Sequence, residues 1–535
     1  MPPTKLNDSS YNFSLTAHPL RRAAIALFAA FLFAFSGANV AIAAGPLTPG
    51  EYDGIDVEAG DYIESDYDIG GVLKYQFNSD TTISPQNGLH PVLVDTETTI
   101  DIKVKDDATL SLISGSPTSS VKMYDGVFNV TGGHLYINSG GVADTIYTLE
   151  GYLSASVNIN NQSITLENTA AGIFADYLPS EYDGHNYLIN TGAFTIRNAF
   201  NGLRIQGNGS PNTVEINADS VSITADQTIS DNNQAAAIYS INYATSHSDT
   251  IKLSAQTLMN LYGKRYGVYQ YGQCTLTMYS PYMTTTGGND GFYINGANDV
   301  TLTGDEISIA GQGRYGIYMS GEDSSYGQGN SFNVISAKSF SLSGGTYALF
   351  SSGAAVGECN QSTFYAPVVV LNAGKYDGVY LDSATLDIRA SESERASIIT
   401  AEGGRYGIGA HNNASALLYA DRIAITGGRH GVVADGSDGN GGSISLSAPV
   451  VTVSAGEGGS SIYTDENGSV TAGDKGALVQ LTGCVKSGYS NDDGTMDKTS
   501  GGTAVLNLDA AGSFLKGQSY DVDWDSRTRD NRGIT

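Results

Sequence analysis

Aromatic side chains that recur at regular intervals are the residues of this sequence best suited to bind a ligand. From about residue 170 a short phrase repeats, in which a small residue precedes an apolar residue and then, most often, an aromatic one. If the apolar residue points inward from a strand, the next residue points outward. The outward positions hold an unbroken aromatic run at Tyr239, Tyr269, Tyr293, Tyr318, Phe350 and Tyr380.

Two interpretations of this aromatic run stay open. Rings stacked about 4.8 Å apart would form an apolar strip with polar phenol tips, which is typical of surfaces that bind sugar rings or dock a protein. Alternatively, tyrosine suits strands and stacks on its neighbours from one repeat to the next. We treat the six residues as candidate ligand-binding residues.

Acidic pairs with catalytic potential are few. Glycoside hydrolysis needs two carboxylates about 5 to 10 Å apart, and we interpret Asp305-Glu306 and Asp492-Asp493 as solvated surface charges. No nucleophile elbow, zinc-protease motif, P-loop or calcium nonapeptide array occurs. The sequence thus predicts no catalytic residue, no metal site and no cofactor.

His430 and the cysteines fit structural roles. His430 stands where other repeats carry Tyr266, Tyr315 and Tyr406, so we interpret it as a corner side chain in place of an aromatic one. The three cysteines lie far apart and form no C-x-x-C pair, so we expect free thiols.

Composition excludes several classes of protein. The formal net charge of −28, from 55 acidic and 27 basic residues, repels nucleic acid and anionic lipid headgroups. Only 15% of the residues are charged, too few for a disordered acidic chain. With 66 glycines and 33 tyrosines among many Ser, Thr and Asn residues, the chain favours short strands with tight turns.

The elements that would position the aromatic run follow from the period of the phrase. Successive phrases lie 24 to 35 residues apart, with a mean near 29, and such a period indicates a solenoid or a propeller. Two further alternating segments lie inside each period, for example 299–303 and 306–309. A propeller blade needs about 40 to 50 residues. We therefore predict a right-handed, single-stranded parallel β-helix with about three strands per ~29-residue coil.

The apolar middle residues of the phrase should form one column inside the coils. They are Ile173, Leu203, Ile238, Val268, Phe292, Ile317, Leu349, Val379, Ile408, Val432 and Ile462. Glycine pairs between the repeats predict corners with positive φ. These pairs are Gly344-Gly345, Gly403-Gly404, Gly427-Gly428 and Gly458-Gly459.

Four regions are predicted along the chain. Residues 1–44 are an export signal, because Arg21 and Arg22 precede an apolar run at 23–35 and small residues at 41–44 offer a cleavage site. An uncleaved membrane anchor is the alternative. Residues 45–150 form an N-terminal cap and the first coils, 151–485 the regular β-helix, and 486–535 an acidic β-rich tail that ends as a truncated chain would. We expect no helical membrane anchor after signal cleavage.

The long signal, the Gly-, Ser-, Thr- and Asn-rich repeats, the few cysteines and the closing runs 501–509 and 512–517 resemble the passenger region of adhesin-type bacterial autotransporters, a pectin-lyase-like β-helix. The resemblance implies an exported, non-enzymatic protein, displayed at the cell surface or secreted. Its partners would be glycan or protein ligands of a host or neighbouring cell, and it would self-associate. Such proteins are similar in carrying a C-terminal barrel of about twelve strands, a pattern not found here, so the periplasm is implied if none is attached.

Other functions stay open at this point. Parallel β-helices also resemble polysaccharide lyases and glycoside hydrolases, so a polysaccharide-degrading enzyme is the alternative function. The motifs Asn-Thr-Asp, Gly-Asp-Asp and Gly-His-Gly of the hydrolases are absent. A purely structural stalk is a third interpretation, and the acidic balance predicts no nucleic-acid partner.

Overall fold

Residues 45–521 of the chain are described by the computed structural model, apart from 54–56, 66–70, 87, 96, 115–117, 144, 153, 176–183, 208–209, 230–233, 244–246, 322–328, 354–358, 437–439, 466, 488–501, 508–509 and 517–518. The predicted signal segment therefore lies outside the described residues. The described residues form strands and no helix, which confirms the all-β, repeat-built class predicted from the sequence. Among them there is accordingly no helix with the length and apolar character that crossing a membrane requires.

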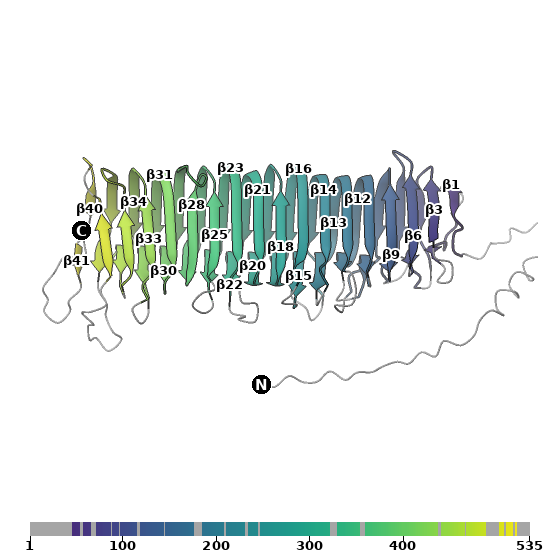
Figure 1. Cartoon of the computed structure of the whole chain (residues 1–535), viewed down its shortest axis with the longest axis horizontal. Coiled ribbons are helices and arrows are strands. Elements are labelled where there is room, and N and C mark those ends of the chain that lie inside the picture. The colour runs from purple at the N-terminus through teal and green to yellow at the C-terminus, as the bar shows by residue number, and fades with distance from the viewer. Residues whose placement is uncertain are drawn as a thin grey trace, which may run out of the picture. The chain divides into compact units, whose positions relative to one another are not determined.

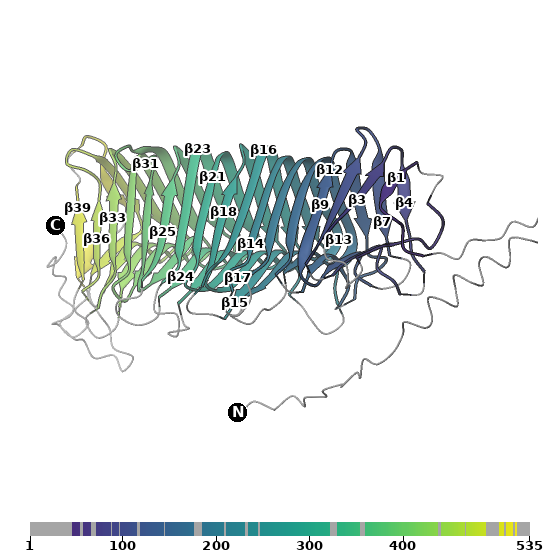
Figure 2. The ribbon, with the colours of Figure 1, turned by 45° about the vertical axis from the view of Figure 1, so that its right-hand side comes forward.

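The strands fall into three stacks, which we name A, B and C. The chain visits them in this order once per repeat: β17 (Tyr266–Gly272) lies in stack A, β18 (Cys274–Tyr279) in B, β19 (Tyr282–Gly287) in C and β20 (Asp290–Gly296) in A again. Strands of one stack pair in parallel, each with the strand one repeat earlier and later. Figures 1 and 2 show these strands following one another in chain order along one axis.

Stack A carries the phrase of the sequence. Its strands are β2 (Ile63–Glu64), β5 (Val92–Val94), β8 (Val121–Met123), β11 (Tyr147–Gly151), the last parts of β12 (Ser156–Ala175) and β13 (Asn186–Gly207), β15 (Ala236–Asn242), β17, β20, β22 (Tyr315–Ser320), β24 (Tyr347–Ser352), β27 (Val379–Asp382), β30 (Tyr406–His411), β32 (His430–Asp435), β35 (Ser460–Thr464), β38 (Cys484–Ser487) and β41 (Ser519–Asp521).

Stacks B and C share several long strands that bend from one stack into the next. Stack B contains β1 (Gly50–Tyr52), β3 (Gly71–Phe77), β6 (Thr98–Val104), β9 (Gly126–Thr131), the first parts of β12, β13, β14 (Thr213–Ala225), β16 (Asp249–Gly263), β21 (Asp299–Gly311), β23 (Ser331–Gly344) and β31 (Ser415–Gly427), and also β18, β25 (Asn360–Tyr365), β28 (Ala384–Arg389), β33 (Ser443–Ser447), β36 (Ser469–Ala472) and β39 (Thr503–Leu506). Stack C contains later parts of these long strands together with β4 (Thr81–Ile83), β7 (Thr109–Ile113), β10 (His134–Asn138), β19, β26 (Val368–Ala373), β29 (Ala396–Gly403), β34 (Val450–Ala455), β37 (Leu478–Thr482) and β40 (Phe514–Lys516).

The inner face of stack A contains the apolar column predicted from the sequence. Its eleven residues pair one above another from Ile173 to Ile462 and are completely buried. Burying such a side chain contributes about 1.5 to 3 kcal/mol. The column continues beyond both ends of the predicted stretch with further fully buried residues. These are Ile63, Val92, Val121, Leu149 and Val485.

The glycine pairs at the corner between stacks C and A serve a purpose different from the predicted one. Gly344, Gly403 and Gly427 do not have positive φ, although Gly458 does, at 75°. A Cβ atom at the first three would lie 1.6 to 1.8 Å from the carbonyl oxygen three residues later. The prediction of positive φ is wrong at these positions because a close approach of the backbone, and not a left-handed conformation, excludes a side chain.

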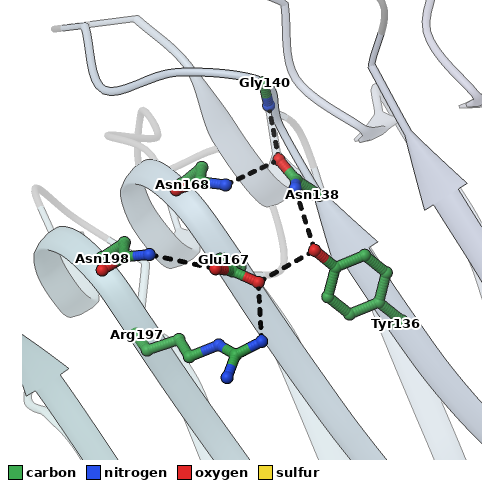
Figure 3. Close-up of polar contacts among 7 residues, drawn as sticks. All are labelled: Tyr136, Asn138, Gly140, Glu167, Asn168, Arg197 and Asn198. Carbon is green, nitrogen blue, oxygen red and sulfur yellow. Dashed lines mark hydrogen bonds and ion pairs between the residues drawn. The ribbon is translucent and has the colours of Figure 1, made fainter.

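Positive φ at this corner occurs instead at asparagine in earlier repeats. Asn168 and Asn198 have φ values of 55° and 50°, in the left-handed region that asparagine tolerates better than most residues. The carboxylate of Glu167 accepts hydrogen bonds from Tyr136 Oη at 2.8 Å, Arg197 Nη2 at 2.9 Å and Asn198 Nδ2 at 3.0 Å (Figure 3). Three consecutive repeats are thereby tied together at their corner.

The corner between stacks A and B carries buried amide side chains in register. Asn298 donates from its backbone N and Nδ2 to Asn330 Oδ1 at 3.2 and 3.0 Å, and Asn330 donates likewise to Asn360 Oδ1 at 2.9 Å. In earlier repeats Asn212 donates in the same way to Asp249 Oδ1, at 3.0 and 3.1 Å. These bonds satisfy backbone N–H groups at buried bends, where strand pairing is interrupted.

Candidate ligand-binding face

The six predicted aromatic residues lie one above another on the outer face of stack A. They come from the consecutive strands β15, β17, β20, β22, β24 and β27, whose register pairs each residue with the next. They share this face because the residue before each one belongs to the inner column. We call these residues, Tyr239, Tyr269, Tyr293, Tyr318, Phe350 and Tyr380, the aromatic ladder.

The rings of the aromatic ladder stack face to face. From Tyr239 to Tyr380 the centroids of successive rings are 5.0, 5.1, 4.7, 5.3 and 4.8 Å apart, and their planes are inclined by 3 to 12°. This spacing is set by the distance between neighbouring strands, about 4.8 Å. The interpretation that tyrosine stacks on its neighbours from one repeat to the next is therefore confirmed. The same stacking aligns the ring edges in one row.

A second aromatic row, which sequence reasoning did not connect with the ladder, supports it from the corner. Tyr266, Tyr315 and Tyr347 each lie three residues before a ladder member of the same strand, with ring centroids 5.0, 4.9 and 5.3 Å from that member. Tyr315 also stacks on Tyr347 at 5.5 Å and 16°. The spacing Tyr-small-apolar-aromatic within one phrase was the signal that would have found this row.

The aromatic ladder is largely half-buried. Tyr239 is only 6% exposed, while the other five residues have intermediate exposure. Burial raises the pKa of Tyr239, Tyr293 and Tyr380 to about 12, and it also raises the pKa of Tyr269. These four phenols are therefore neutral near pH 7, and that of Tyr239 donates a hydrogen bond to Gln234 Oε1 at 2.7 Å.

The stacking determines what the ladder offers to a ligand. Inside the run each ring has a neighbour on both faces, so a sugar ring has no free face on which to lie flat. The outward surface consists of ring edges and phenol tips. Because ring edges carry the positive end of the aromatic quadrupole, this row attracts oxygen-rich groups.

A histidine ends the ladder on its C-terminal side. The next ladder position is Gly409, and the ring of His411 continues the aromatic stack, with its centroid 4.7 Å from that of Tyr380. A Cβ atom at Gly409 would lie 2.8 Å from His411 Nε2, so the histidine occupies the space of a ladder side chain. His411 Nδ1 in turn pairs with Asp435.

Two positions that were expected to point outward are buried. Phe174 is 4% exposed because Tyr147 stacks on it, with ring centroids 4.0 Å apart. Val433 is 1% exposed and pairs with Tyr463, whose ring stacks on His430. The outer column is therefore accessible over part of its length only.

Two buried carboxylates anchor the strands that carry the second row. Asp290 Oδ1 accepts hydrogen bonds from Arg314 Nε at 3.1 Å and from the backbone N–H of Tyr315 at 3.2 Å, while Oδ2 pairs with the same guanidinium. Asp377 and Arg405 repeat this arrangement, with 2.8 Å from Nε to Oδ1. Burial raises the pKa of Asp290, although Arg314 acts against that rise. Each pair joins two consecutive repeats.

Sequence reasoning missed these buried ion pairs. The signal is the phrase Asp-Gly-apolar-Tyr at 290–293 and 377–380, followed one repeat later by Arg-Tyr-Gly-Ile at 314–317 and 405–408. Since the partners are 24 and 28 residues apart in the sequence, they can be recognised as neighbours only once the register of the repeats is known.

His430 has structural partners, as expected of a corner side chain. Its Nδ1 accepts the backbone N–H of Ser460 at 3.1 Å, and its ring stacks on that of Tyr463 at 5.5 Å. Burial, reinforced by Arg429, lowers the pKa of His430 to about 4, so the ring is neutral. The strand register pairs it with Tyr406, in the corner position predicted from the sequence.

The acidic pair and the thiols considered for chemistry also have ordinary surroundings. Lys338 Nζ lies 3.2 Å from Asp305 Oδ2 and 3.8 Å from Glu306 Oε1 on the exposed surface. The pair at 492–493 lies outside the described residues. Cys274 is a buried free thiol, and the other two cysteines are free and half-buried. Within the described ranges, no three His, Cys, Asp or Glu side chains are grouped so as to hold a metal ion.

Comparison with known proteins adds no relative to this picture. No family model matches the chain, and no curated protein and no solved structure matches it either.

Proposed function

We propose that this chain is an exported, non-enzymatic adhesin, built as a right-handed, single-stranded parallel β-helix that is similar to autotransporter passengers. In this proposal the chain is displayed at the cell surface or secreted, and its aromatic face binds a glycan or protein ligand of a host or neighbouring cell. The observation that carries the proposal is the aromatic ladder, in which six rings stack in one row and all but Tyr239 are partly exposed.

The parallel pairing of the three stacks supports the proposed fold. Each repeat passes through stacks A, B and C and returns to stack A beside its previous strand. Connections between parallel strands of one sheet are right-handed in about 98% of cases, because twisted strands favour that hand. This preference supports a right-handed coil.

The chemistry of the face supports binding over catalysis. Asp290 and Asp377, the carboxylates buried beside the second aromatic row, are each committed to a guanidinium and to a backbone N–H. Both carboxylate side chains are completely buried, so neither can contact a substrate as a general acid or base must. The alternative of a polysaccharide-degrading enzyme gains no residue from this face.

The export part of the proposal depends on residues 1–44, which lie outside the described residues. Two arginines, an apolar run and small residues follow one another there in the order typical of a signal peptide. The resemblance of the repeats to adhesin passengers supports the same location.

Binding by ladder variants tests the proposed function. The triple variant Tyr269→Ala, Tyr293→Ala, Tyr318→Ala removes half of the ladder rings, so we expect roughly a tenfold or greater loss of binding to a glycan array or to intact target cells. The matched control is Tyr152→Ala, Tyr279→Ala, Tyr282→Ala, which removes tyrosines that are 44 to 48% exposed elsewhere. This control should bind as the original chain does.

A milder variant separates binding from folding. Replacing the same three ladder tyrosines by phenylalanine keeps the ring stack, since Phe350 already occupies a ladder position. Binding that survives in the folded alanine triple variant, verified by circular dichroism, would overturn the proposal. Equal losses in the ladder and control variants would overturn it as well.

A further inference from the structure

The corner between stacks C and A carries a column with four arginines beside the aromatic ladder. In successive repeats one position of this corner holds Arg265, Asn289, Arg314, Thr346, Tyr376, Arg405 and Arg429. Backbone hydrogen bonds join each residue to the next, for example from Asn289 N to Arg265 O at 2.8 Å and from Arg429 N to Arg405 O at 2.8 Å. The corner is therefore a continuous ridge rather than a series of separate loops.

Three cations of this ridge are exposed and uncompensated. Lys264, Lys375 and Arg429 are exposed, and none of them forms an ion pair within the part of the chain that the structure describes. Elsewhere cations are neutralised by neighbours, as Arg197 is by Glu167 at 2.9 Å and Arg395 by Asp474 at 2.6 Å. The ridge is thus locally positive on a chain whose formal net charge is −28.

Acidic side chains lie at the opposite edge of the same face. Asp382 and Asp435, with His411, occupy the outer positions at the C-terminal ends of the stack A strands. The corner segments 263–266, 287–289, 311–315, 344–347, 373–376 and 427–429 contain no acidic residue, whereas 402–405 and 455–459 contain the exposed Glu402 and Glu457. An anionic ligand would therefore be drawn to the corner edge of the face and repelled from the other edge.

The cations and the rings present the same polarity to a ligand. The guanidinium of Arg314 lies 5.2 Å from the centroid of the Tyr315 ring, and that of Arg405 lies 4.4 Å from the Tyr406 ring. Lys375 Nζ lies 4.9 Å from the Tyr376 ring. The adjoining ladder turns its ring edges outward, which carry partial positive charge. Both parts of the face thus favour oxygen atoms that are negatively charged.

We propose that the ridge and the aromatic ladder form one extended site for an anionic glycan, whose carboxylate or sulfate groups contact Lys264, Lys375 and Arg429. The sugar rings lie along the ring edges of the ladder. This inference rests on the proposed adhesive function and names its ligand class. From Lys264 to Arg429 the ridge passes through six repeat steps, about 29 Å at about 4.8 Å per strand, so the ligand is a polymer and not a single sugar.

Charge-matched variants of the full chain test this inference. The variant Lys264→Gln, Lys375→Gln, Arg429→Gln removes the three uncompensated cations. The control Lys74→Gln, Lys103→Gln, Lys252→Gln removes three exposed lysines from the outer face of stack B. The probes are hyaluronate with carboxylates, heparin with additional sulfates, and dextran as an uncharged polymer. Binding is measured by biolayer interferometry at about 50 mM and about 500 mM salt, which differ strongly in screening.

We expect the original chain to prefer the anionic polymers over dextran, and the ridge variant to lose roughly tenfold in affinity for them at low salt. The control should change by less than about twofold. A difference between hyaluronate and heparin identifies which anionic group the ridge selects.

Several results would overturn the inference. Equal losses in the ridge and control variants would show that overall charge, and not the ridge, attracts the ligand. Dextran binding as tight as hyaluronate binding would remove the anionic preference while leaving the adhesive function intact. Duplex DNA that binds as tightly as hyaluronate would show that the ridge attracts anionic polymers in general and is not a site for glycans. Failure of the original chain to bind any glycan, on the polymers and on the array, would overturn both the inference and the glycan part of the proposed function.

Discussion

Two rows of side chains run along stack A on opposite sides of its backbone, and they differ in the residue types that they contain. The inner row is apolar and completely buried in every repeat from Ile63 to Val485. The outer row, one residue later in each strand, is varied. In chain order it reads Glu64, Leu93, Lys122, Glu150, Phe174, Arg204, the six residues of the aromatic ladder, Gly409, Val433, Tyr463 and Lys486.

The contrast between the two rows shows which of them the architecture needs. Strands with Lys122, Gly409 or Lys486 in the outer row stack in the same parallel register as those with tyrosine. An aromatic outer residue is therefore not required for one repeat to stack on the next. Six consecutive aromatic residues in a row that tolerates lysine and glycine call for a reason outside the fold, and ligand binding is the reason we propose.

Adjacent residues of β20 give the largest expected effect. Phe292 belongs to the inner row and Tyr293 to the outer row. Phe292→Ala leaves a cavity among fully buried neighbours, so we expect the free energy of unfolding to fall by about 3 to 5 kcal/mol in urea denaturation. If Tyr293→Ala costs as much, the distinction between the two rows is lost.

A carboxyl in the interior tests how strictly buried positions reject charge. Asp249 is completely buried, its Oδ2 has no hydrogen-bond partner, and burial raises its pKa to about 7. Between its unfolded value of 3.8 and about 7, the folded chain holds a proton that the unfolded chain has released. Stability from this group is therefore fully present below about pH 4 and is lost as the pH rises to about 7.

The isosteric variant Asp249→Asn removes this dependence. We expect it to exceed the original chain in unfolding free energy by about 1 to 4 kcal/mol at pH 8 and to match it near pH 4. The corresponding corner positions of other repeats hold Asn212, Asn298, Asn330 and Asn360, which shows that asparagine fits this corner. Thermal unfolding at both pH values measures the difference. A variant that is less stable than the original at pH 8 would show that the carboxylate is tolerated.

The inner row could be predicted from the sequence because a single rule governs it. Each strand must bury one apolar residue at the same place, so the period of the phrase predicts the column directly. Ile63 and Val92 were not predicted because the first repeats are less regular. The ladder was predictable for the same reason, since the outer residue follows the inner one.

Contacts between repeats could not be predicted from the period of the sequence. The pair of Asp290 and Arg314 depends on how many residues the intervening loops contain, and repeat lengths of 24 to 35 residues hide such partners. His411 lies over Gly409 although both belong to one strand, because only the folded backbone shows that the ring fills the empty position. At Gly403 the sequence correctly predicted a corner. Glycine is required there because of a nearby carbonyl oxygen and not because of a positive φ.

A smaller effect on stability is expected in the outer row. Tyr293→Ala removes two stacking contacts, at 5.1 and 4.7 Å, from a half-exposed ring, so we expect a loss of about 1 to 2 kcal/mol. Tyr293→Phe keeps both contacts and should change stability by less than about 0.5 kcal/mol. Urea denaturation of both variants measures these differences. A large loss in the phenylalanine variant would mean that the phenol group, rather than the ring stack, stabilises the face.

Lengthening the aromatic ladder should have the smallest effect on stability. Gly409 does not have positive φ, so a tyrosine fits its backbone once the ring of His411 is removed. The double variant Gly409→Tyr, His411→Ala adds a seventh ring in register with Tyr380. Because the outer row is optional for stacking, we expect the free energy of unfolding to stay within about 1 kcal/mol of the original.

If the ladder binds an extended ligand, however, each added ring edge adds contact, and affinity for the polymer identified by the glycan assays should rise by roughly two- to fivefold. His411→Ala alone is the control, since it removes the histidine without adding a ring. Unchanged affinity together with a clear gain in stability would assign the aromatic run to the fold and return the outer row to the same role as the inner one.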